Sequence, residues 1–241
     1  MRTYAWMPLA AALVSCNKVG FDAVSISPIY SYVEGCNAVR VSGHGFAEDI
    51  SVTVSMPDAS GVAVTADLES LVLAKDDPAV TDPDLKALNV GFYVLGVMPG
   101  APAGTSGYAD INVTSDGVTA SLPQAYYYVA CPADALVEGY GPSSGVTAGS
   151  DVSLQGCNLD AATMQVQLLD ETGAPVGQQV PLVSDCRTAA VHFAAPAQPD
   201  GTYYVTLVDA KGNVLAGEPC GLQDSATYYC TDYPITYGGA K

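Results

Sequence analysis

The sequence predicts an all-β protein with two tandem β-sandwich domains. The composition is the first reason, because 24 Gly, 16 Pro and 15 Tyr among 241 residues favour strands and turns over helices. The length is the second, because a chain of this size is sufficient for two ordinary domains, each with its own core. The third is an internal repeat that covers most of the chain.

The repeat relates residues 24–131 to residues 135–232. ISVTVSMPDASGVAV parallels MQVQLLDETGAPV as a hairpin, GYADINVTSDG parallels GTYYVTLVDAKG, and QAYYYVAC parallels SATYYCT as the last strand. The first repeat is longer in its middle, so residues 66–88 are predicted to form a surface insertion. The boundary near Pro132 to Asp134 is too short for free tumbling, and an elongated rod of two sandwiches is expected.

Several stretches of both repeats have a family likeness. Pro28, VRVSGHGF and GYADINVTSDGVTASLPQAYYYV in the first half, with GPSSGVTAGSDVSLQGCNL, GTYYVTLVDAKG and ATYYC in the second, resemble the IPT/TIG family of immunoglobulin-like domains. The second half departs from the pattern at Leu159, where the first half has the aromatic Phe46. The resemblance implies two immunoglobulin-like sandwiches that serve in extracellular adhesion, as spacers or as receptor modules, without chemistry of their own.

The N-terminus predicts export. Arg2 precedes an apolar run from Tyr4 to Val14, which has the size of a signal-peptide core and is too short to span a bilayer. The run ends in LVSC, which resembles the bacterial lipobox. We therefore expect residues 1–15 to be a signal peptide, Cys16 to carry the lipid, and residues 16–23 to form a lipidated linker, with the protein in the cell envelope, at the outer membrane or cell surface. The alternative is an ordinary signal peptide, or a short buried segment, that happens to contain a cysteine.

The net charge limits the partners. The formal charge is −17, with 25 acidic residues against 8 Lys and Arg. Nucleic acid is excluded as a partner, because binding to it depends on basic side chains that neutralise phosphates. The same charge weakens contact with anionic lipid head groups, so membrane attachment is expected to depend on the N-terminal lipid.

The cysteines agree with an oxidising compartment. Six remain besides Cys16, and we expect all of them to form disulfides: Cys36, Cys131, Cys157, Cys186, Cys220 and Cys230. Fifteen pairings are possible. The domain division favours Cys36 with Cys131, and Cys220 with Cys230 as a staple of the final hairpin, which leaves Cys157 with Cys186 by elimination.

No reactive constellation stands out, so the chain is not expected to be an enzyme or to carry a cofactor. The segment GPSSG at residues 141–145 fits the letters of the hydrolase nucleophile elbow, but that elbow needs a following helix and a strand-like segment follows here. His44 lies between turn glycines and His192 lies inside a strand pattern. We interpret both histidines as structural, because neither has a partner that the sequence indicates.

Two further patterns have a structural and a functional interpretation. Four carboxylates crowd one loop and could bind calcium, although a solvated acidic loop is the commoner explanation; they are Asp76, Asp77, Asp82 and Asp84. The tyrosines at 126–128, 203–204 and 228–229 could form a stacking platform for sugars or peptides. Strand alternation alone, however, sends one tyrosine inward and its neighbour outward.

The sequence therefore favours a non-catalytic surface lipoprotein that acts as an adhesion, spacer or envelope-assembly module through protein contacts. The alternative is a carbohydrate-binding lipoprotein with exposed tyrosines near a sandwich edge or on the insertion as its site. The partner, protein or glycan, and the oligomeric state are not indicated.

Overall fold

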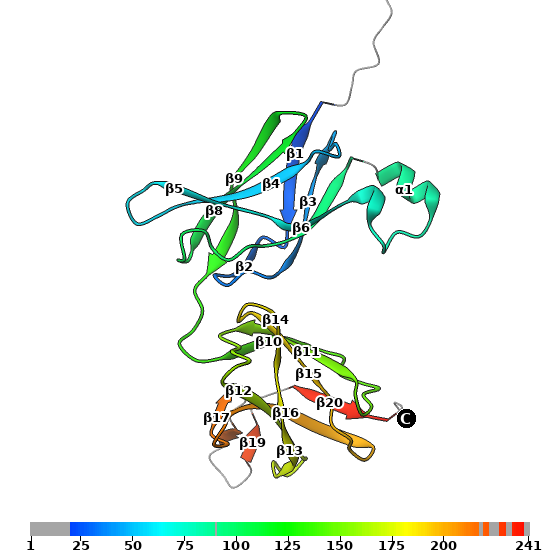
Figure 1. Ribbon diagram of the computed structural model, residues 1–241, viewed down its shortest axis with the longest axis vertical. Coiled ribbons are helices and arrows are strands. Elements are labelled where there is room, and N and C mark those ends of the chain that lie inside the picture. The colour runs from blue at the N-terminus through cyan, green and yellow to red at the C-terminus, as the bar shows by residue number, and fades with distance from the viewer. Residues whose placement is uncertain (1–19, 90, 217–218, 222–226, 230–232, 239–241) are drawn as a thin grey trace, which may run out of the picture.

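A computed structural model describes residues 20–89, 91–216, 219–221, 227–229 and 233–238 (Figure 1). The all-β prediction is confirmed, because the regular structure is almost entirely strand. Figure 1 shows two β-sandwiches one above the other, joined by a short connection after β9. Among the described residues, no helix is long and apolar enough to cross a membrane.

The first sandwich contains nine strands, one 3-10 turn and one short helix. These elements are β1 (Asp22–Ser27), β2 (Tyr30–Tyr32), β3 (Ala38–His44), β4 (Ser51–Pro57), β5 (Ala63–Asp67), β6 (Glu69–Leu73), η1 (Ala74–Asp76), α1 (Pro83–Asn89), β7 (Tyr93–Val97), β8 (Gly107–Ser115) and β9 (Val118–Val129). One sheet has the order β1-β3-β7-β6 and the other has the order β2-β9-β8-β4-β5. Strand β2 pairs with β9 in parallel, and the other pairs are antiparallel.

Alternation of apolar residues builds the core between these two sheets. In β4, Val52, Val54 and Met56 are buried while the residues between them are not, which is the two-residue period of a half-buried strand. Ile111 and Val113 of β8 are buried in the same cluster. The outer faces of the two sheets carry side chains that do not pack in the core, and the candidate site lies on one of these faces.

The second sandwich repeats the arrangement. Its elements are β10 (Leu136–Gly141), β11 (Asp151–Cys157), β12 (Met164–Leu169), β13 (Pro175–Pro181), β14 (Val183–Cys186), β15 (Ala190–Ala194), β16 (Gly201–Asp209), β17 (Val214–Ala216), β18 (Pro219–Gly221), β19 (Thr227–Tyr229) and β20 (Pro234–Tyr237). One sheet has the order β10-β11-β15-β14. In the other, the order is β13-β12-β16-β17, and β20 also pairs with β16. Strands β4, β5 and β8 thus correspond in position to β12, β13 and β16.

The last strand of the second sandwich differs from the expected one. The matched segment SATYYCT contains β19, but β19 pairs with β18 in a separate hairpin. The place beside β16 belongs instead to β17 and β20, and Ile235 and Tyr237 of β20 are buried in the core. The core therefore extends beyond the expected end at residue 232, because Ile235 and Tyr237 of PITY face inward.

The expected insertion at residues 66–88 is only partly a surface loop. Strand β6 pairs with β7, and Leu68 just before it is buried in the core. The segment enters the sheet because LESLVL contains enough apolar residues to pack on it. From Ala74 onward, η1 and α1 lie outside the sheets, at the side of the first sandwich in Figure 1.

Candidate functional site

Three exposed tyrosines form a row across adjacent strands of the first sandwich. Tyr30 of β2 is directly opposite Tyr127 of β9, and Tyr127 is directly opposite Tyr108 of β8. Directly opposed residues project from the same face of a sheet, so the three side chains lie side by side. Their exposed fractions are 57%, 38% and 59% for Tyr30, Tyr127 and Tyr108. We call this row the tyrosine ladder.

The opposite face of β9 explains why the ladder faces outward. Tyr126 and Tyr128 flank Tyr127 and are fully buried, with ring centroids 5.3 Å apart. Burial raises the pKa of Tyr126 to about 12 and also raises the pKa of Tyr128. The predicted alternation is therefore confirmed for this run. The sequence interpretation overlooked Tyr30 and Tyr108, which join Tyr127 only through the cross-strand register.

The ladder borders a shallow groove of about 310 Å³. The rings of Tyr108 and Tyr127 are 4.8 Å apart and inclined by 64°. Ile29, which is also exposed, and Gln124 lie on its margins, and none of the residues that line it is charged. A contiguous exposed apolar patch of this kind is typical of a binding surface.

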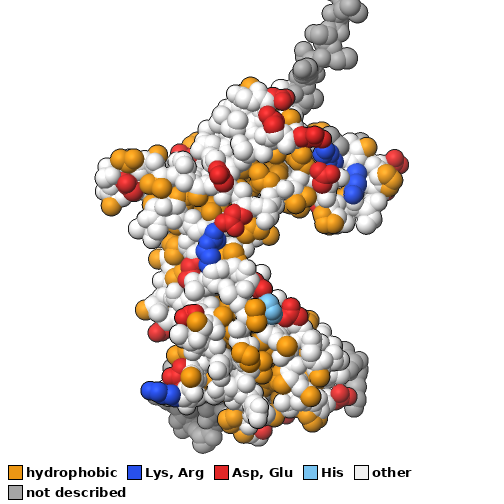
Figure 2. Space-filling model, viewed as in Figure 1, with side chains coloured by type: hydrophobic (Ala, Val, Ile, Leu, Met, Phe, Trp, Pro, Cys, Tyr) orange, Lys and Arg blue, Asp and Glu red, His pale blue; other side chains and the backbone are white. Residues whose placement is uncertain are grey.

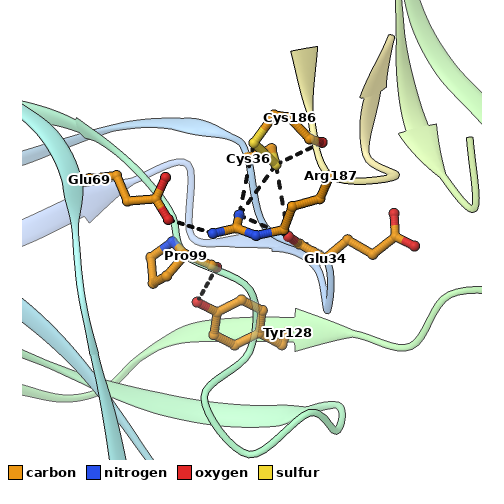
Figure 3. A network of polar contacts seen from close by, with 7 residues as sticks. All are labelled: Glu34, Cys36, Glu69, Pro99, Tyr128, Cys186 and Arg187. Atoms are coloured by element: carbon orange, nitrogen blue, oxygen red, sulfur yellow. Dashed lines mark hydrogen bonds and ion pairs between the residues drawn. A yellow bond between two sulfur atoms is a disulfide. The ribbon is translucent and has the colours of Figure 1, made fainter. Parts of the chain in front are cut away.

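A second concentration of contacts, the junction clasp, joins the two sandwiches (Figure 3). The Cys36–Cys186 disulfide links the turn after β2 to the end of β14, with Cα atoms 5.9 Å apart. Arg187 forms an ion pair with Glu69 of the first sandwich, and its Nη1 donates to the carbonyl oxygen of Glu34 at 3.3 Å. The same Nη1 lies 3.4 Å from Cys36 Sγ.

A second disulfide fixes the connection itself. Cys131, just after β9, is bonded to Cys157 at the end of β11. The neighbouring Asn158 donates its backbone N–H to both carboxylate oxygens of Glu34 at 3.2 Å, and its Nδ2 donates to the Pro132 carbonyl oxygen at 2.6 Å. Covalent and polar contacts therefore hold the junction together, and the disulfides indicate an oxidising compartment and an exported protein.

The expected cysteine pairing is wrong for the four cysteines that the structure describes. Cys36 pairs with Cys186 rather than with Cys131, and Cys157 pairs with Cys131 rather than with Cys186. All four lie at strand ends or turns that face the junction, so bonds form across it instead of within each core. The expected Cys220–Cys230 bond lies outside the described side chains, as does the lipobox with Cys16.

Between the sandwiches lies a junction cleft of about 190 Å³. Tyr30 and Asn37 line it from the first sandwich, and Glu138 and Gln155 line it from the second. Tyr32 Oη donates a hydrogen bond of 2.5 Å to Glu138 Oε1 across the cleft. Burial and then the neighbouring Glu138 raise the pKa of Tyr32 to about 12, so this phenol remains a donor at neutral pH.

The four carboxylates of the acidic loop do not converge on one point. Among the described residues, no three of its four carboxylates lie within 4.8 Å of one another. Asp77 instead accepts hydrogen bonds of 2.8 Å from the Ala79 N–H and from Tyr93 Oη, contacts that lower its pKa. Asp82 accepts from the Asp84 N–H. Asp77 and Asp82 therefore stabilise the loop, because N–H and O–H groups of the chain itself donate to their carboxylate oxygens.

Within the described part of the chain, Glu34 lies close to Cys131 and Cys157, which are residue types that can bind a metal ion. The two sulfur atoms are bonded to each other, so neither is a thiolate that could bind a metal ion.

The histidines and the serine motif lie apart from the ladder. His192 Nδ1 is 2.6 Å from Asp185 Oδ1 and its Nε2 is 3.7 Å from Asp151 Oδ1. Within the described ranges no hydroxyl or thiol hydrogen-bonds to this ring, whereas nucleophilic catalysis needs one within reach. His44 contacts the edge of Phe92. The GPSSG serines lie in the loop between β10 and β11, and both flanking elements are strands.

Comparisons with known proteins add no functional assignment. Neither a scan against known protein families nor a search of curated proteins finds a match. The chain is similar to the extracellular region of plexin A4, at 16% identity and a TM-score of 0.32, over 98% of this chain and 20% of that one. It is also similar to SGBP-B of a Bacteroides ovatus mixed-linkage glucan utilization locus, in complex with a mixed-linkage heptasaccharide, at 17% identity and a TM-score of 0.34, over 84% of this chain and 42% of that one. The Yersinia pseudotuberculosis adhesin InvE matches at 12% identity and a TM-score of 0.27, over 92% and 61% of the two chains. At these scores the likenesses carry no argument about function.

Proposed function

We propose that this chain is a non-catalytic surface module that binds a protein partner through the tyrosine ladder and is held to the cell envelope by a lipid on Cys16. The single observation that carries the proposal is the row of three solvent-exposed tyrosines on neighbouring strands. Tyrosine offers a large apolar ring and a polar tip at low entropic cost, and it is enriched among the residues that dominate protein interfaces.

The junction supports a spacer role for the rest of the chain. Two disulfides and the Arg187–Glu69 ion pair connect the sandwiches, whereas a flexible connection would let the domains move independently. Figure 2 shows the narrow waist between the two sandwiches and acidic side chains spread over both. A rod of this kind holds the ladder at a fixed orientation relative to the second sandwich.

Carbohydrate binding is the second candidate, since the ladder lies at the β2 edge of a sandwich and its rings are exposed. The ring geometry favours a protein. A flat stacking platform for sugar rings needs aromatic faces that lie in one plane, and the rings of Tyr108 and Tyr127 are inclined by 64°. An irregular protein surface can accommodate this inclination.

Site-specific photo-crosslinking on cells that carry the protein tests the proposal. A benzoylphenylalanine at position 127 should give one discrete protein adduct, and the same probe at Val118, exposed on the same strand, should not. With the purified partner, a Tyr108→Ser/Tyr127→Ser variant should bind at least about tenfold more weakly, and Val118→Ser should bind like the parent chain. Equal adducts at both positions would refute the proposal, and glycan-array binding that requires Tyr127, without any protein adduct, would replace it with carbohydrate recognition.

Lipid attachment has a separate test. The intact mass of protein purified from native membranes should begin at Cys16 and include acyl chains. A mass that begins at another residue, or that lacks acyl groups, would contradict the anchor and leave the ladder proposal standing.

A further inference from the structure

The junction cleft contains an ionisable side chain, Glu138, that is not part of the tyrosine ladder. We infer that this cleft receives a basic side chain of the partner, an ammonium or guanidinium group that pairs with Glu138. The inference rests on the proposed protein-binding function and adds the chemistry of the partner to it.

The first argument is the hydrogen bonding of the Glu138 carboxylate. Tyr32 Oη donates to its Oε1, and this phenol stays protonated at neutral pH because its pKa is about 12. The second oxygen, Oε2, receives no hydrogen bond from any described residue, so one acceptor of a charged group remains free to bind a ligand.

The second argument is the charge of the cleft. Glu138 is the one formally charged residue among those that line it, and no Lys or Arg is among them. Arg187 contacts the lining residue Cys36, but its guanidinium pairs with Glu69. A neutral ligand would leave the carboxylate without a counter-charge, whereas a cation would form a charge-assisted hydrogen bond with it.

The third argument is the remaining chemistry of the walls. The exposed side chains of Asn37 and Gln155 offer amide oxygens as acceptors for further N–H groups. Tyr30 supplies an aromatic ring, and aromatic faces attract ammonium and guanidinium groups. The cleft, of about 190 Å³, can admit a side chain of the partner.

The fourth argument is continuity with the ladder. Tyr30 lines both the ladder groove and the junction cleft. A partner segment that lies across the ladder can therefore place one side chain in the cleft without leaving the surface. The net charge of −17 also attracts basic partners over a longer range and increases their rate of encounter.

Titration of the full, disulfide-bonded chain with small probes tests the inference by NMR. The probes are Nα-acetyl-L-lysine methylamide, the corresponding arginine compound, and the neutral norleucine compound as a matched control. The basic probes should shift the backbone amides of Asn37, Gly139 and Gly156 saturably, and the norleucine probe should not. Added salt should weaken the binding, because it screens an exposed ion pair.

Two variants isolate the carboxylate. Glu138→Gln keeps the oxygen that accepts from Tyr32 and removes the charge, so it should weaken the basic probes about tenfold or more, the range expected for a hydrogen bond to a charged group. Glu171→Gln removes the same charge from an exposed turn of the second sandwich and should leave the affinity unchanged. Equal affinity of the parent chain and Glu138→Gln would overturn the inference, and so would saturable shifts of the same amides by a neutral oligosaccharide and not by the basic probes.

The outcomes separate this inference from the proposed function. A protein adduct at position 127 together with an inert Glu138→Gln substitution would reject the cleft and keep the ladder. Binding of the basic probes without any adduct at position 127 would support the cleft as a cation site and reject the ladder as a protein-binding surface.

Discussion

Two neighbouring buried tyrosines are expected to respond in opposite ways to the same substitution. Tyr128 Oη donates a hydrogen bond of 3.0 Å to the Pro99 carbonyl oxygen. Tyr126 Oη is equally buried but has no hydrogen-bond partner among the described residues. The Ser31 hydroxyl opposes the rise that burial causes in the pKa of Tyr126. Its own proton is donated to the carbonyl oxygen of Tyr32.

The magnitudes follow from these contacts. Tyr128→Phe loses one hydrogen bond and leaves the Pro99 carbonyl without it, which should lower the free energy of unfolding by about 1–2 kcal/mol. Tyr126→Phe removes an unpaired buried hydroxyl and should be neutral or stabilising by up to about 1 kcal/mol. Each 1 kcal/mol corresponds to roughly 4–8 °C in the midpoint for a domain of up to about 100 residues.

The measurement is differential scanning calorimetry of both variants. The transition that shifts is assigned to the first sandwich, because both tyrosines lie in its core. The midpoint should fall for Tyr128→Phe and stay or rise for Tyr126→Phe. Tyr237→Phe serves as a control, because its hydroxyl is also buried without a described partner and lies in the second sandwich. Equal destabilisation by Tyr126→Phe and Tyr128→Phe would refute the reasoning, since burial of the ring rather than the hydrogen bond would then determine the cost.

Three other predictions concern the junction, the turns and a close backbone approach. Replacing Cys36 and Cys186 by Ser should broaden the distribution of domain orientations and raise the radius of gyration in small-angle X-ray scattering; superimposable curves would show that polar contacts suffice. Three hairpin turns each contain an aspartate whose pKa is lowered by a side-chain donor and then by backbone N–H donors; they are Asp58, Asp170 and Asp209. The stabilisation from these aspartates is complete above the unfolded-state pKa, and it is lost as the pH falls through the lowered pKa. Asn at all three should flatten the acid limb of a stability–pH curve, and an unchanged limb would contradict this. A Cβ on Gly156 would lie 1.8 Å from the Leu136 carbonyl oxygen, so Gly156→Ala should cost about 1–3 kcal/mol in urea unfolding. Gly141→Ala, which meets nothing within 4 Å, should be neutral.

The sequence was sufficient for the fold class because the core depends on local alternation. The two-residue period of β4 and β8 can be read directly from SVTVSMP and GYADINVTS, and the same period in both halves predicts two sandwiches. The final strand was assigned wrongly because ATYYC and PITY carry similar local patterns. Only the position beside β16 distinguishes them, and that position depends on contacts distant in sequence.

The candidate site was less predictable for a related reason. Alternation predicts that Tyr127 faces outward, but the partnership with Tyr30 and Tyr108 requires the register of three strands. The cysteine pairing failed because the two domains were treated as separate units. Cys36 and Cys186 are 150 residues apart in sequence and meet only because the sandwiches pack end to end.

The long-range disulfide also changes how the molecule would respond to mechanical load. A pull on the two ends of the chain passes from Cys36 directly to Cys186, because the covalent bond is the shortest path between them. The segment between these residues, with its sequence separation of 150, carries no tension and cannot lengthen while the bond is intact. Most of the first sandwich, with Tyr108 and Tyr127 of the ladder, lies inside this segment and would keep its shape under load. Tyr30 and strands β15, β16 and β20 lie outside it and would bear the force.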